Sequence, residues 1–129
     1  MSEKVLLNEI PVEVFNKRLS SLETVVKYLK ENLNYRIADI SRLTNRKYST
    51  ISTTYKKSKK KFPKRFDIKD MEYSIPILVF KKKKYSPLEL VVSYLKNNYK
   101  LKFKEISKFL HRDPKTIYTV YSRYNKKNE

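Results

Sequence analysis

The sequence predicts a mainly α-helical protein made of two tandem three-helix units, each preceded by a short extended arm. The first observation is a duplication: residues 20–58 align without a gap on residues 86–124, and 16 of the 39 pairs are identical. The second is that apolar residues recur at three- and four-residue steps in both copies, as on one face of a helix. The third is size, because units of about sixty residues (1–64 and 65–129) favour short packed helices over a large sheet.

The first helix of each copy begins at a local capping signal. Ser20 with Glu23, and Ser86 with Glu89, form the S-x-x-E capping box, and Pro87 occupies a first helical position where no N–H is needed. The apolar residues that follow are expected to face a core. They are Leu22, Val25, Val26, Leu29 and Leu33 in the first copy and Leu88, Val91, Val92, Leu95 and Tyr99 in the second.

Two further helices with a turn between them complete each copy. Asp113 is a good N-cap for the third helix, and Pro114 suits its first position. The second helix is expected to bury Ile37, Ile40 and Leu43, or Phe103, Ile106, Phe109 and Leu110. The third is expected to bury Ile51, Thr54, Tyr55 and Ser58, or Ile117, Val120, Tyr121 and Tyr124.

A short motif precedes each copy, as Ile10–Phe15 (IPVEVF) and Ile75–Phe80 (IPILVF). Proline keeps the preceding residue out of the helical region, and the β-branched and aromatic residues that follow favour an extended arm. The two arms are expected either to pair with each other or each to cover its own unit. Pairing of arms between two chains is a further alternative. The linker of residues 62–85 could span roughly 80 Å, so it does not fix the spacing of the units.

The net charge predicts an anionic partner. Thirty-one Lys and Arg against thirteen Asp and Glu give +18, and the excess is shared by residues 1–66 and 67–129. Nucleic acid is the usual partner of such a charge, and the eleven tyrosines among the lysines favour binding because Tyr contacts phosphate and stacks on bases. A solvated lysine-rich surface is the alternative.

Composition argues against several other classes. The chain has no Cys, no Gly and one His, so thiol chemistry, glycine-rich phosphate loops, histidine triads and zinc sites are not expected. We expect no enzyme, no cofactor, no metal and no small-molecule ligand. The longest apolar run, residues 75–80, is too short to span a bilayer, so we expect a cytoplasmic protein at the nucleoid.

The last two helices of each copy carry a recognisable pattern. Residues 39–45 (DISRLTN) with 49–51 (STI), and 105–110 (EISKFL) with 115–117 (KTI), resemble the E-I-A-x-x-L-G-x-S-x-x-T-V core of helix-turn-helix domains typified by sigma factor region 4. The usual turn Gly is replaced by Asn45 and by His111, which both tolerate a positive φ. A generic three-helix repeat with a protein partner is the alternative.

The resemblance implies that the start and outer face of each last helix contact double-stranded DNA. We also include lysines that follow the first of these helices among the candidates, because lysine contacts phosphate. The candidate DNA-binding residues are Arg46, Lys47, Tyr48, Ser49, Ser52, Thr53, Lys56, Lys57 and Lys60 in the first copy and Arg112, Lys115, Thr116, Tyr118, Thr119, Ser122 and Arg123 in the second.

The two outer faces differ, since Tyr48 aligns with Pro114 and Ser52 with Tyr118, so a perfect palindrome is not the expected target. Both faces lack Asn and Gln, the best readers of adenine. The function predicted is a small transcription regulator or a nucleoid protein that packages DNA. The alternatives are an RNA- or ribosome-associated protein and a protein-assembly module whose arms add strands to a partner.

Overall fold

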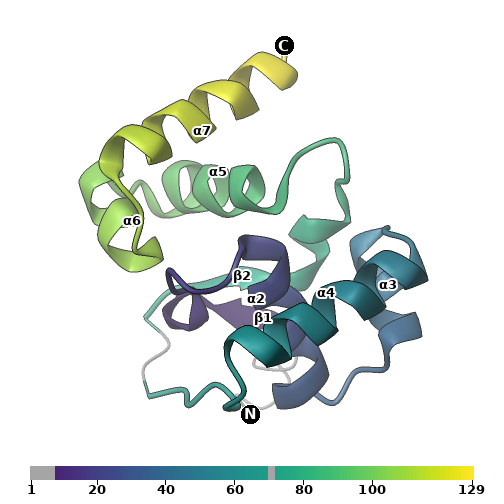
Figure 1. Cartoon of the computed structure of the whole chain (residues 1–129). Coiled ribbons are helices and arrows are strands. Elements are labelled where there is room, and N and C mark those ends of the chain that lie inside the picture. Colours follow the sequence, from purple (N-terminus) through teal and green to yellow (C-terminus); the bar gives the residue numbers. More distant parts are fainter. Residues whose placement is uncertain (1–7, 70–71) are drawn as a thin grey trace.

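A computed structural model describes residues 8–69 and 72–129 (Figure 1). Within these residues the fold is mainly helical, with six α-helices and a two-stranded antiparallel sheet. The mainly helical architecture expected from the sequence is therefore confirmed. No helix in the described part of the chain is long and apolar enough to cross a membrane.

The first repeat, residues 20–58, begins at the expected capping box. The Ser20 hydroxyl accepts from the Glu23 backbone N–H, and the Glu23 carboxylate accepts from the Ser20 N–H at 2.9 Å. The helix that follows changes from α-helical to π-helical geometry partway along, which the apolar spacing did not predict. The elements are α2 (Ser21–Lys27), the π-helical η2 (Tyr28–Asn32), α3 (Ile37–Thr44) and α4 (Tyr48–Lys61).

The second repeat, residues 86–124, has the same order of helices. Ser86 and Glu89 form the equivalent capping box, and Pro87 is the first residue of its helix. Asp113 caps the last helix, as expected, by accepting from the Lys115 backbone N–H at 2.8 Å. The elements are α5 (Pro87–Tyr99), α6 (Phe103–Leu110) and α7 (Pro114–Lys127).

The arms pair with each other, which was one of the expected arrangements. Strand β1 (Glu9–Pro11) lies antiparallel to β2 (Ser74–Pro76). The expectation that Val12, Val14 and Phe15 continue the strand is wrong, because each strand ends at its proline and a 3₁₀ turn follows, η1 (Val12–Val14) or η3 (Ile77–Lys81). Val12 and Val14 of the η1 turn are buried, and so is Phe15, which follows the turn in an extended conformation.

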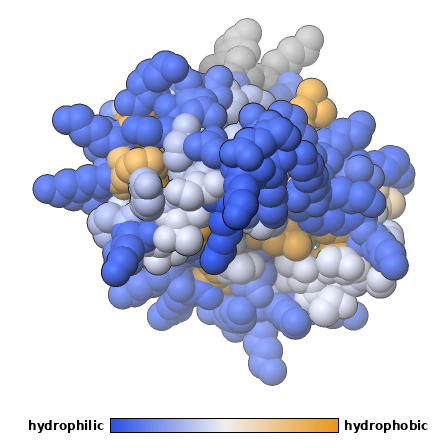
Figure 2. Space-filling model, turned by 90° about the horizontal axis from the view of Figure 1, so that it is seen from above, coloured by the Kyte–Doolittle hydropathy of each residue, from blue (hydrophilic) through white to orange (hydrophobic). Residues whose placement is uncertain are grey.

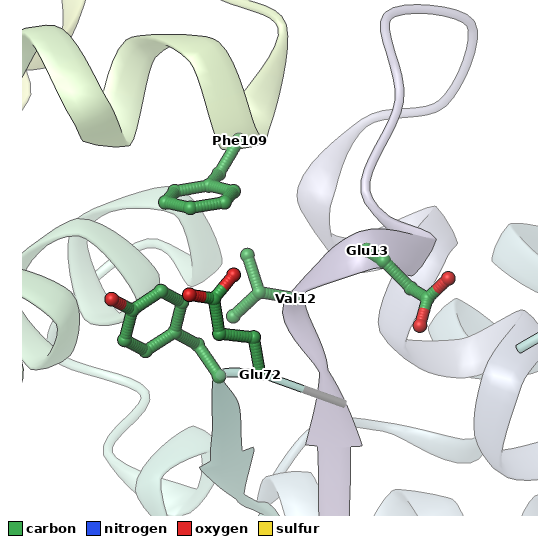
Figure 3. Close-up of a pocket in the computed structure, with 5 residues that line it drawn as sticks. Val12, Glu13, Glu72 and Phe109 are labelled. Carbon is green, nitrogen blue, oxygen red and sulfur yellow. The ribbon is translucent and has the colours of Figure 1, made fainter. Parts of the chain in front are cut away.

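Each arm crosses to the other repeat. The η1 turn packs against α6 of the second repeat, and η3 packs against α3 of the first while also touching α5. Figure 3 shows Phe109 of α6 above Val12 of the first arm, and the Phe109 ring also meets the Tyr73 ring edge to face at 5.2 Å. The alternative in which each arm covers only its own repeat is therefore wrong.

One hydrophobic core runs through both repeats and both arms. Ile10 and Ile75 are fully buried between the helices, and α2 also contacts α5 directly. A unit of about sixty residues buries too little surface for more than marginal stability, and this shared core offsets that limit. The fully buried core residues include Ile10, Val25, Val26, Leu29, Ile40, Ile51, Ile75, Val91, Val92, Leu95, Ile106, Leu110 and Ile117.

Candidate nucleic-acid interface

The turn before each last helix depends on one residue in the left-handed region. Asn45 ends α3 at φ 54° and ψ 42°, and His111 ends α6 at φ 56° and ψ 45°. The positive φ expected at these two positions is confirmed without any glycine. The hydroxyls of Ser41 and Ser107 donate to the carbonyls of Arg46 and Arg112, so the same bond closes both turns.

Each last helix buries one face and leaves the other free. Ile51 on α4 and Ile117 on α7 are fully buried, as expected for their core faces. Tyr48 is 59% exposed and Tyr118 is 58% exposed, although large aromatic side chains are usually mostly covered. The Tyr118 ring also meets the Phe103 ring edge to face at 5.5 Å, so part of its surface packs on α6 while the rest faces solvent.

Most of the candidate residues lie on these free faces. Ser52 is half-buried, and so are Arg46 and Arg112. The exposed candidates are Lys47, Tyr48, Ser49, Thr53, Lys56, Lys57, Lys60, Lys115, Thr116, Tyr118, Thr119, Ser122 and Arg123.

Arg46 and Arg112 face the other repeat. The Arg46 guanidinium donates to the Phe80 carbonyl at 3.0 Å and to the Tyr85 carbonyl at 3.4 Å. The Arg112 guanidinium donates to the Leu19 carbonyl at 3.2 Å. Burial lowers the pKa of both arginines. Their hydrogen bonds tie each turn to the segment that leads into the other repeat. Nothing local in the sequence distinguishes such an arginine from one that contacts phosphate.

Equivalent pairs anchor the last helices on the first helices. The Lys61 ammonium lies 2.9 Å from the Glu23 carboxylate, and the Lys127 ammonium lies 2.8 Å from the Glu89 carboxylate. Although burial opposes it, hydrogen bonds from Ser20 and Lys61 lower the pKa of Glu23. Each glutamate therefore caps the first helix of its repeat and also anchors the end of the last helix. The capping pattern alone could not reveal this second role.

A polar cluster inside the first repeat was not predicted. Lys27 has no exposed side-chain surface, and its ammonium lies 2.5 Å from the Glu31 carboxylate. The rings of Phe62 and Phe66 lie 5.9 and 5.5 Å from that ammonium. Tyr55 donates to Glu31 at 2.9 Å, and burial together with this bond raises the pKa of Tyr55 to about 12. The cluster positions α4 on the first helix and lies on its inner side, away from the exposed candidates.

The free faces combine positive charge with hydroxyl groups. Neither α4 nor α7 contains an acidic residue, whereas α4 carries five lysines and α7 carries three lysines and one arginine. Figure 2 shows that the side of the molecule bearing α7 is covered mainly by hydrophilic residues, with smaller apolar patches between them. Such a surface has the charge and hydroxyl groups that suit contact with phosphate.

The structure also bears on metal and small-molecule sites. Among residues 8–69 and 72–129, no group of three or more His, Asp or Glu side chains is placed to hold a metal ion. A small pocket of about 60 Å³ lies where the arms meet α6, lined by Val12, Glu13, Glu72, Tyr73 and Phe109 (Figure 3). Drug-sized ligands occupy clefts of roughly 300–1,000 Å³, so this pocket is a packing gap at a junction. Larger open depressions of about 350–410 Å³ also lie on the surface, one of them lined by Arg18, Phe62, Pro63 and Lys64.

Comparisons with protein-family models, with curated proteins and with solved structures found no match to this chain.

Proposed function

We propose that the protein binds double-stranded DNA through α4 and α7, with α3–α4 and α6–α7 acting as two helix-turn-helix motifs. The observation that carries the proposal is the pair of equivalent last helices, each free of acidic residues and each exposing Lys, Tyr, Ser and Thr beyond a tight left-handed turn. A helix of about 10–12 Å diameter fits a major groove of about 12 Å width.

The position along each helix suggests which residues meet bases. In helix-turn-helix docking, residues at the start of the last helix reach the base edges. Lys47, Tyr48 and Ser49 occupy that place in α4, and Lys115 and Tyr118 occupy it in α7. Lys56, Lys57 and Lys60 follow further along α4, where phosphate contact is the more natural role.

The chemistry of the free faces favours contacts to the DNA backbone. Lys, Ser, Thr and Tyr bind phosphate readily. None of the proposed contacts on α4 and α7 is Asn or Gln, the residues that read adenine best. A small regulator with modest sequence preference and a nucleoid protein that coats duplex DNA both fit this composition. Either role places the protein at the nucleoid.

RNA is the second candidate, and one observation favours it. Exposed tyrosines can stack on unpaired bases, and Tyr48 and Tyr118 are each more than half exposed on a basic face. The two candidates differ in what the tyrosines touch: phosphate and base edges in a duplex, or the faces of splayed bases in single strands.

A titration with three probes separates the candidates. The full chain is titrated with a random 30-base-pair duplex, a single strand of the same sequence and a structured RNA, each over a range of salt concentration. We expect the duplex to bind most tightly at every salt and its affinity to fall linearly on a log–log plot as salt rises, because bound cations are released. Tighter binding of RNA at every salt would overturn the proposal, and so would the absence of duplex binding at low salt.

A further inference from the structure

The two arms pair through equivalent residues of the duplicated motif. Within the motif repeated at an offset of 65, Ile10 is the equivalent of Ile75, and these two residues lie directly opposite each other in the sheet. On either side, Glu9 lies opposite Pro76, and Pro11 lies opposite Ser74. Because Glu9 is equivalent to Ser74 and Pro11 to Pro76, exchanging the two arms leaves the pairing unchanged. A local two-fold axis therefore passes between Ile10 and Ile75.

Backbone hydrogen bonds beyond the strands obey the same symmetry. The Val12 N–H donates to the Tyr73 carbonyl at 2.9 Å, and the Ile77 N–H donates to the Asn8 carbonyl at 3.0 Å. Each donor and each acceptor is the equivalent of its counterpart at the offset of 65. The axis therefore extends beyond the strands to the ends of both arms.

The hydrogen bonds of Arg46 and Arg112, at the turns, follow the same symmetry. Arg46 of the first repeat reaches the Tyr85 carbonyl, and Arg112 of the second reaches the Leu19 carbonyl. At the offset of 66, Leu19 is the equivalent of Tyr85. When each unit contacts the equivalent part of the other, the interface is isologous. Two units related by translation along the chain would instead contact each other through unlike surfaces.

The arrangement of the helices agrees with a two-fold relation. In Figure 1, α3 and α6 lie on opposite sides of the small sheet. The exchange of arms is also reciprocal, with η1 on α6 and η3 on α3. A tandem duplication in sequence has thus folded into the arrangement of a two-fold dimer with exchanged arms.

We infer that the two repeats recognise inverted DNA half-sites held at one fixed spacing, an inference that rests on the proposed function. The orientation follows from the axis, since two-fold symmetry in a helix-turn-helix protein is mirrored by inverted half-sites in its DNA. A direct repeat, which the tandem sequence alone would suggest, does not fit this geometry.

The spacing is fixed because the repeats share one core. The repeats are joined by both arms, by the Arg46 and Arg112 hydrogen bonds and by the contact between α2 and α5, so their relative position does not depend on linker length. The half-sites are unlike in sequence, since Tyr48 stands where the second repeat has Pro114, and Tyr118 stands where the first has Ser52. The target is therefore an imperfect inverted repeat.

Selection from a random duplex pool tests the orientation. The full chain is used to enrich bound molecules from a pool with a 40-base-pair random segment, and these are sequenced. We expect two related motifs in inverted orientation at a single spacing. Direct orientation, variable spacing, or retained duplex binding without any motif would each overturn the inference while leaving DNA binding in place. Failure of the pool to bind would instead overturn the proposed function.

Rearranged versions of the selected duplex test the same point quantitatively. Reversing one half-site, or inserting five base pairs to turn it by about half a helical repeat, should weaken binding on the order of 100-fold, because only one repeat then engages. An insertion of ten base pairs tests the fixed spacing, and it should weaken binding as well. Unchanged affinity after the reversal or after either insertion would contradict the inference.

Discussion

Ile10 and Ile75 lie directly opposite each other at the centre of the β1–β2 pair, and both are fully buried. Each is the equivalent of the other in the duplicated arm motif. Their contact joins the arms at the point about which the two repeats are related. The stability of each repeat should therefore depend on the other.

Truncation of either central isoleucine is expected to destabilise the whole chain. Ile10→Ala or Ile75→Ala should lower the free energy of unfolding by about 2–5 kcal/mol, because each change leaves a cavity in the shared core. Urea unfolding followed by circular dichroism should still show one transition for both repeats. Leu78→Ala is the matched control in the second arm, since Leu78 is 67% exposed, and it should change stability by less than about 0.5 kcal/mol. Two separate transitions would refute the shared core.

The arginine bonds between the repeats should be structural. Arg46→Ala and Arg112→Ala should each lower the free energy of unfolding by about 1–3 kcal/mol, because each leaves partly buried carbonyls without their charged donor. Arg123→Ala is the control, since Arg123 is exposed on α7, and it should have little effect on unfolding. The opposite ranking, with Arg123→Ala the more damaging to folding, would count against this role.

Glycine should suit one of the two turns better than the native residue. His111 has a positive φ of 56°, which crowds a side chain that bears a Cβ atom. His111→Gly should therefore raise the free energy of unfolding by about 0.5–1 kcal/mol after the flexibility of glycine in the unfolded chain is taken into account. Asn45→Gly should change it less, because Asn adopts this conformation more readily. A loss of stability in His111→Gly would mean that the side chain itself is needed.

Acid should weaken the attachment of α4 through Glu23. The pKa of Glu23 is lowered in the folded protein from an ordinary value of 4.5. A lowered folded pKa contributes stability above 4.5, and this contribution is lost as the pH falls through the folded value. Thermal unfolding of Glu23→Gln should show lower stability at neutral pH and a smaller loss on acidification than the native chain. Parallel pH profiles for the two proteins would rule out this carboxylate as a contributor.

Local patterns in the sequence predicted the parts of the fold that local chemistry decides. The capping boxes at Ser20 and Ser86 need only a hydroxyl and a carboxylate three residues apart. The left-handed turns at Asn45 and His111 followed from the resemblance to helix-turn-helix domains, in which these two residues take the place of the turn Gly. The exposed faces of α4 and α7 followed from helical periodicity and the placement of Ile51 and Ile117.

Long-range packing could not be read from those patterns. Arg46 and Arg112 bind backbone carbonyls, and every residue type offers a carbonyl, so no partner residue marks these contacts. Lys27 pairs with Glu31 one turn further along the same helix, but its burial also depends on Phe62 and Phe66, which reach it from the segment that follows α4. The arms were expected to be extended, but a 3₁₀ turn follows the proline of each arm, and no local pattern in the sequence marked that change.

The central claim is that the free faces of the last helices contact duplex DNA, and binding by one double variant tests it most directly. Lys115→Glu with Tyr118→Ala should leave helical content unchanged and weaken duplex binding by at least about tenfold, with a shallower salt dependence. Lys69→Glu is the matched control, since it makes the same charge change at an exposed residue outside both last helices, and it should bind within about threefold of the native chain. Native affinity in the double variant, or an equal loss in the control, would contradict the claim.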